Sequence, residues 1–178
     1  MAHHNKLVTS RLLLRAVRLK LSSKSNMAWS KHLGRPLLVG VSCFAFLMPF
    51  VASLLMQRRA RYIWVIQTLL AFMSDYVTSA DPSFWHLADN AAAPANFLGF
   101  AWLAFARSDL SAPHYCALLS APLFFYRRSL QAISQQNFSN YQINHTLWHL
   151  LCGVNATVAL LSVASPDADY GRLRHSYF

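Results

Sequence analysis

The feature of this sequence that most constrains its fold is a series of five apolar segments separated by short polar loops. The first, residues 36–56, has about 20 residues and no charged side chain, which matches the length of a helix that crosses a bilayer. The others cover about 62–79, 91–106, 114–126 and 143–163. The third and fourth are short for a span, so we expect them to be tilted, extended by their flanks or re-entrant. The sequence therefore predicts an all-α, multi-pass transmembrane helical bundle of about five spans.

The composition agrees with a membrane protein. The chain is 55% hydrophobic and 12% charged, whereas a soluble domain averages about 45–50% and about 25%. Sixteen Lys and Arg stand against six acidic residues, all of them Asp, and the first acid is Asp75. These values exclude a disordered chain, a disulfide scaffold and an ordinary soluble enzyme. Because the basic residues lie ahead of the first apolar segment or in short loops, we expect membrane lipids as partners and no nucleic acid.

The sequence divides into three parts. Residues 1–35 form a basic amphipathic segment in which Arg11, Arg15 and Arg18 share one helical face. Its Arg-rich, Ser-containing and acid-free composition fits either a mitochondrial or plastid transit peptide or an interfacial helix held by anionic lipids. Residues 36–165 form the transmembrane bundle, and 166–178 a polar C-terminal tail. The expected location is an organellar membrane, mitochondrial or plastid, or an endomembrane, and the sequence does not choose between them.

Five Asp and His residues in or beside the apolar segments are candidate functional residues. An Asp at the centre of a membrane helix costs roughly 2.5–3.5 kcal/mol, so such residues indicate function by default. If every segment spans, the order of the helices brings all five to one membrane face. They are Asp75, His86, Asp89, His145 and His149.

The spacing of the histidines suggests a metal site. His145 and His149 lie one helical turn apart on one face, a common way for one helix to supply two ligands. With His86 as a third ligand and one open position, the set would make a catalytic zinc site. Asp75 or Asp89 would then be catalytic, as the general base or as the group that orients the water. Histidines that only contact headgroup water, and an Asp75 that only bonds a neighbouring helix, remain the alternatives.

The final apolar segment carries Asn-His-Thr-Leu-Trp-His, ending at His149, and follows a helix bearing Ser and Asp and a separate His. This pattern, over about 62–165, resembles the CREST superfamily, which includes the alkaline ceramidases and the progestin/adiponectin receptors. The resemblance implies a multi-span protein that holds zinc near one membrane face, and enzymatic members hydrolyse lipid amide bonds. It assigns His86, His145 and His149 as ligands, Asp89 or Asp75 as the Asp, and Ser74 or Ser79 as the Ser.

Two functions from different classes follow. The first is a zinc-dependent hydrolase of a lipid amide or ester bond, and the second a non-catalytic membrane subunit or assembly factor of an organellar complex. Short loops, the transit-like leader and the absence of Glu favour the second, which would have other membrane subunits as partners. The three cysteines are interpreted as small buried hydrophobes, because they lie in apolar runs without a CxxC pair. They are Cys43, Cys116 and Cys152.

Overall fold

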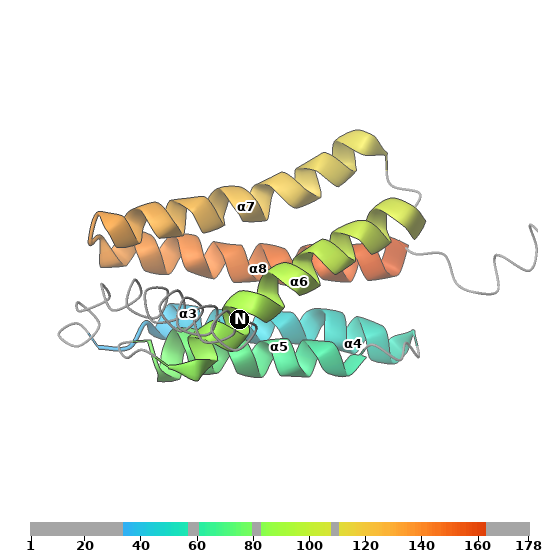
Figure 1. Ribbon diagram of the computed structural model, residues 1–178. Coiled ribbons are helices and arrows are strands. Elements are labelled where there is room, and N and C mark those ends of the chain that lie inside the picture. Colours follow the sequence, from blue (N-terminus) through green and yellow to red (C-terminus); the bar gives the residue numbers. More distant parts are fainter. Residues whose placement is uncertain (1–33, 57–60, 80–82, 108–110, 163–178) are drawn as a thin grey trace, which may run out of the picture.

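The computed structural model describes residues 34–56, 61–79, 83–107 and 111–162, and the regular secondary structure in these ranges is entirely helical, which confirms the all-α prediction. The predicted leader, apart from residues 34 and 35, and the predicted tail at 166–178 lie outside the described residues. The elements in chain order are α3 (Leu37–Ser42), η2 (Cys43–Phe46), α4 (Leu47–Leu55), α5 (Tyr62–Phe72), η4 (Met73–Val77), α6 (Phe84–Arg107), α7 (Ala112–Ser134) and α8 (Phe138–Ser162) (Figure 1).

Each predicted apolar segment becomes one continuous rod of helix. The first rod joins α3, η2 and α4, and the second joins α5 and η4. The short third and fourth segments are extended by polar flanks into α6, with 24 residues, and α7, with 23. By length and composition, only Leu37–Leu55 among the described helices is apolar enough to cross a membrane. Membrane association thus has support from one helix, and the number of spans remains a prediction.

α8 is the central rod of the bundle. It packs against α7 on one side and against the first rod on the other, with α6 crossing at a tilt (Figure 1). The approach to the first rod is close at Gly153, where an added Cβ would overlap the backbone carbonyl of Ala45. Because α8 has no side chain at this position, it can lie directly against η2. This contact sets how near the histidines of α8 come to the first rod.

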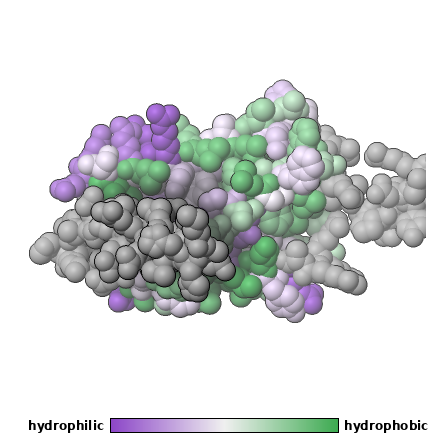
Figure 2. Space-filling model, in the orientation of Figure 1, coloured by the Kyte–Doolittle hydropathy of each residue, from purple (hydrophilic) through white to green (hydrophobic). Residues whose placement is uncertain are grey.

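The first rod is apolar on its outer face, and its two serines are buried on its inner face among apolar residues. Its exposed side chains repeat every three or four residues, as one helical stripe does; they include Leu37, Val41, Phe44, Met48, Val51 and Leu55. Ser42 and Ser53 are buried on the opposite side. Figure 2 shows patches of hydrophobic side chains on the visible face, with hydrophilic ones gathered over the end of α7. An exposed apolar stripe such as that of the first rod favours lipid as the surroundings.

Both of the first two rods depart from α-helical geometry at the end of the bundle that holds the ionisable residues. The first tightens into a 3₁₀ turn at η2, and the second widens into a π-helix at η4, where Thr78 N bonds Met73 O. Such irregular turns inside helices are frequent at functional sites. Cys43 and Asp75 lie within them.

One prediction about the cysteines is wrong. Cys116 is exposed, whereas Cys43 is buried and Cys152 is half-buried. The reason is the orientation of α7, whose buried face is formed further along the helix by Pro122, Ser129 and Ala132.

Candidate metal centre

The carboxylate of Asp75 is the point at which the histidines of α8 converge. Its Oδ2 lies 3.1 Å from His145 Nε2 and 3.4 Å from His149 Nε2. Asp75 is 4% exposed, and His145 and His149 are 9% and 2% exposed, so solvent contributes little to this contact. The structure thus brings together three of the five residues that the sequence places at one membrane face.

The other ring nitrogen of each histidine is held by a serine. Ser42 Oγ lies 2.9 Å from His149 Nδ1, and Ser129 Oγ lies 3.4 Å from His145 Nδ1. Each serine also donates its single proton to a backbone carbonyl within its own helix. Ser42 donates to Val39 O at 2.8 Å, and Ser129 donates to Tyr126 O at 2.7 Å.

These contacts are compatible with a proton on Nδ1 of both rings. A serine that donates its proton to a backbone carbonyl accepts from the imidazole, and in the neutral ring Nε2 is then an acceptor. The opposite tautomer, in which Nε2–H donates to Asp75, fits the same distances. Histidines that ligate a metal usually donate their second nitrogen to a neighbouring group, and Ser42 and Ser129 are placed to accept such a bond.

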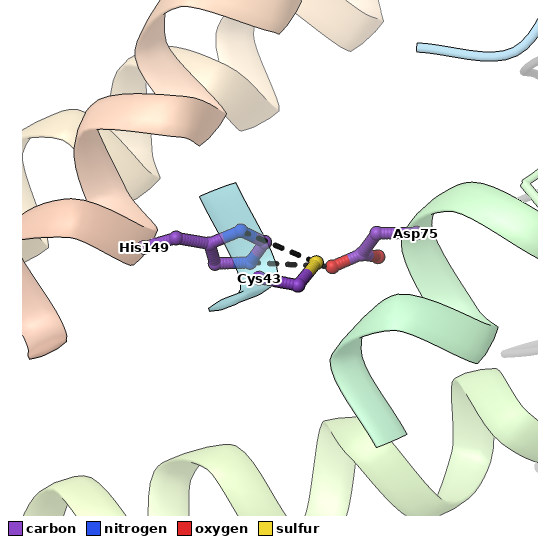
Figure 3. Close-up of side chains that lie close together, drawn as sticks. All are labelled: Cys43, Asp75 and His149. Carbon is purple, nitrogen blue, oxygen red and sulfur yellow. Dashed lines mark hydrogen bonds and ion pairs between the residues drawn. The ribbon is translucent and has the colours of Figure 1, made fainter. Parts of the chain in front are cut away.

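Cys43 completes a group of potential ligands. One ligand atom each from Cys43, Asp75 and His149 lie within 4.8 Å of one another, and all three residues are buried (Figure 3). Cys43 Sγ is 3.7 Å from His149 Nδ1. The group could therefore hold a metal ion.

His86 lies beside this group rather than within it. Ser74 Oγ is 2.8 Å from His86 Nδ1 and donates to Asp75 Oδ1 at 3.2 Å, so one serine separates His86 from Asp75. His86 Nε2 is 3.0 Å from Thr78 O. Because a backbone carbonyl only accepts, Nε2 carries a proton here. Ligation by His86 remains a prediction, and in this geometry both of its nitrogens have protein partners.

Asp89 is held on the opposite side of the site. It accepts a hydrogen bond from Gln67 Nε2 at 3.0 Å, and Gln67 Oε1 in turn accepts from Asn96 at 2.8 Å. The chain of amides fixes the carboxylate. Of the two predicted serines, Ser74 joins the site, whereas Ser79 donates to Tyr76 O at 3.2 Å.

A cavity of about 320 Å³ opens beside these residues and contacts both predicted catalytic carboxylates and both histidines of α8. The remainder of its wall is mainly apolar and aromatic, and includes Phe97, Leu98, Leu123, Tyr126 and Trp148. A binding site for a ligand with a long apolar part and one polar group has this composition. We call it the outer cavity.

Sequence reasoning missed four residues of the site. Cys43 was assigned to packing, and Ser42, Ser129 and Gln67 were not singled out. The sequence signal that could have identified them is a polar residue inside an apolar segment. Ser42 interrupts an aliphatic run, and Gln67 is the one amide in the second segment. Such residues need partners inside a bundle.

The comparisons with known proteins add nothing to this geometry. No protein-family model matches the chain, and it matches neither a curated protein nor a solved structure.

Proposed function

We propose that this protein is a multi-pass membrane hydrolase that uses zinc to cleave a lipid amide or ester bond. The observation that carries the proposal is the convergence of the Nε2 atoms of His145 and His149 on Asp75, next to a largely apolar cavity. Thiolate, carboxylate and imidazole together make a donor set typical of zinc. A zinc ion in an open site acts as a Lewis acid and makes water nucleophilic at neutral pH.

The position of each residue in the site indicates its role. Cys43, Asp75 and His149 would hold the metal, because they form the compact ligand group. Three protein ligands leave one position for water or substrate, as in catalytic rather than structural zinc sites. Ser42 would keep the ring of His149 oriented through its contact with Nδ1.

His145 would act as the general base. Its Nε2 lies 3.1 Å from the Asp75 oxygen and the residue lines the cavity. With its proton on Nδ1, the ring would take the proton of the attacking water at Nε2 and return it to the leaving group. Asp89, held by Gln67, would accept a hydrogen bond from the substrate's amide N–H or from water. The apolar wall would receive the lipid chain.

The proposal is tested with the full chain purified in detergent. We expect about one zinc per chain, loss of zinc in His149→Ala and Cys43→Ser, and retention of zinc in Cys116→Ser, whose thiol is exposed on α7. A chelator should stop hydrolysis of a fluorogenic fatty amide or ester, and added zinc should restore it.

Zinc-free protein, or zinc unaffected by both ligand variants, would overturn the metal centre. Zinc binding without turnover of any amide or ester, together with co-purification in a larger membrane complex, would favour the alternative of a non-catalytic subunit.

A further inference from the structure

The outer cavity has its mouth between α6 and α7. Its exposed lining residues all come from these two helices, and they are Pro94, Leu98, Leu123 and Leu130. The three leucines are 47–66% exposed. Side chains that line a cavity and also contact the surroundings mark its mouth. α6 and α7 diverge from their connected ends toward the metal centre, which leaves room for this mouth (Figure 1).

Arg127 lies on the edge of the mouth that α7 forms. Leu123, Arg127 and Leu130 follow i, i+4, i+7 spacing, so they share one stripe of the helix, and the Arg127 side chain is exposed. Arg128 comes five residues after Leu123, which turns it to another face, and there it donates to Gln131 Oε1 at 3.5 Å. Of two adjacent arginines, one therefore belongs to the mouth and the other does not.

Arg127 also lies at the level of the proposed general base. Ser129 Oγ is 3.4 Å from His145 Nδ1, so this part of α7 runs beside His145. Arg127 precedes Ser129 by two residues, a rise of about 3 Å along the helix. The neighbouring Tyr126 lines the cavity and packs on Trp148, with ring centroids 4.9 Å apart. A charged group next to an amide held at His145 would thus lie at the height of Arg127.

The guanidinium of Arg127 has no counter-ion among the described residues, where it makes neither a hydrogen bond nor an ion pair. Its neighbours in the stripe are both leucines. Arginines in apolar surroundings are costly and mark sites where a partner is bound. A planar guanidinium pairs best with a carboxylate or a phosphate, which it can hold through two parallel hydrogen bonds.

We propose that Arg127 binds the anionic group of a lipid whose acyl chain occupies the outer cavity. The preferred ligand is then a fatty amide or ester with a carboxylate or phosphate close to the scissile bond, and an N-acyl amino acid is the simplest amide of this kind. The inference rests on the proposed function for the position of that bond at His145, and it adds the charge of the headgroup. A neutral headgroup would leave the guanidinium without a counter-ion.

The experiment compares N-oleoylglycine with N-oleoylethanolamine, two amides with the same acyl chain and headgroups of similar size, of which only the first is charged. Binding to the full chain in an uncharged detergent is measured by competition against a fluorescent fatty amide. A chelator is present, so that neither turnover nor a contact between carboxylate and zinc contributes. The wild type should bind N-oleoylglycine at least as tightly as the neutral amide, although Asp75 and Asp89 line the same cavity.

In Arg127→Gln, the affinity for N-oleoylglycine relative to the neutral amide should fall about fivefold, the upper ratio that an exposed ion pair supplies. Arg127→Lys keeps the charge and should retain most of the ratio. Arg128→Gln removes the same charge from the adjacent position and should leave the ratio unchanged. Thermal unfolding in detergent checks that each variant is folded.

Four results would overturn the inference. They are weaker binding of N-oleoylglycine than of the neutral amide by the wild type, an unchanged ratio in Arg127→Gln, an equal loss in Arg128→Gln, and failure of both amides to compete. N-acetylglycine carries the headgroup without the chain and should not compete; equal competition would show a general anion site and would also overturn it. The expected ratios in a chain that hydrolyses neither amide when zinc is supplied would instead overturn the proposed function alone.

Discussion

His149 and His86 both have a serine beside Nδ1, but they differ in the group beside Nε2. Both have a serine hydroxyl within 2.9 Å of Nδ1. At Nε2, His149 faces a carboxylate that already has a second imidazole, whereas His86 faces a backbone carbonyl. A carbonyl requires a proton on the ring, whereas a carboxylate shared by two imidazoles can accept either a ring proton or a cation. The comparison teaches that the group beyond the ring, rather than the histidine or its spacing, separates a candidate ligand from a structural donor.

The variant Asp75→Asn should lower zinc affinity more than any other, because it changes the group that distinguishes His149 from His86. It removes the negative charge and supplies an amide N–H that can satisfy one imidazole, so a cation is no longer needed. We expect zinc affinity, measured by competition with a chromogenic chelator, to fall by more than the 10–100-fold typical of a residue that only supports a ligand. Asp89→Asn should leave zinc affinity unchanged. Zinc binding by Asp75→Asn at wild-type affinity would contradict the assignment.

Ser42→Ala should have the next largest effect. Without the hydroxyl, the ring of His149 loses the acceptor that fixes its tautomer, and we expect zinc affinity to fall about 10–100-fold. Ser53→Ala is the matched control on the same rod, because Ser53 Oγ is buried without a hydrogen-bond partner among the described residues. Equal zinc affinity in the two variants would show that the serine has no supporting role.

Gly153→Ala tests whether packing brings His149 to the first rod. The added Cβ overlaps the Ala45 carbonyl, so α8 must move away from η2, at a cost of about 1–3 kcal/mol in the free energy of unfolding. Zinc affinity should fall with it, because Cys43 lies in η2. Gly99→Ala meets nothing within 4 Å on α6 and should instead stabilise the protein by about 0.5–1 kcal/mol. Thermal unfolding in detergent separates the two, and a Gly153→Ala protein as stable as the wild type would refute the close contact.

His86→Gln should have the smallest effect on zinc. It removes the contacts with Ser74 and Thr78, so we expect a lower unfolding free energy, by about 1–3 kcal/mol for two hydrogen bonds. The zinc content should stay at the wild-type value. Loss of zinc in this variant, with zinc retained in Cys43→Ser, would restore the ligand set of His86, His145 and His149 that the sequence pattern predicts.

Much of the fold was readable from the chain, because apolar runs of helical length leave few alternatives. The five segments correspond to the five rods. The segments 91–106 and 114–126 looked too short to span because their helices continue into polar residues. Hydropathy gives no signal for these polar parts of α6 and α7. That His145 and His149 share one face could also be predicted, because both lie on one helix and the helical period fixes their spacing.

The rest of the site depended on contacts between helices that no local pattern encodes. Cys43 and Ser42 reach His149 across 106 and 107 positions of the sequence. Their approach requires the glycine at 153 on the partner helix, and neither residue type signals this alone. The 3₁₀ and π turns that present Cys43 and Asp75 were likewise invisible to an argument based on a regular helical period.

The π turn at Met73–Val77 has a consequence for how such a site arises. A π-helix closes its hydrogen bonds over one residue more than an α-helix, as Thr78 does with Met73. A single inserted residue in an ordinary helix produces this geometry, and removing one residue would rotate the preceding side chains by about 100° relative to those that follow. The position of Asp75 beside the histidines of α8 thus depends on one residue of the π turn. Deleting a single codon there can abolish the candidate metal site, whereas the helices and their bundle persist.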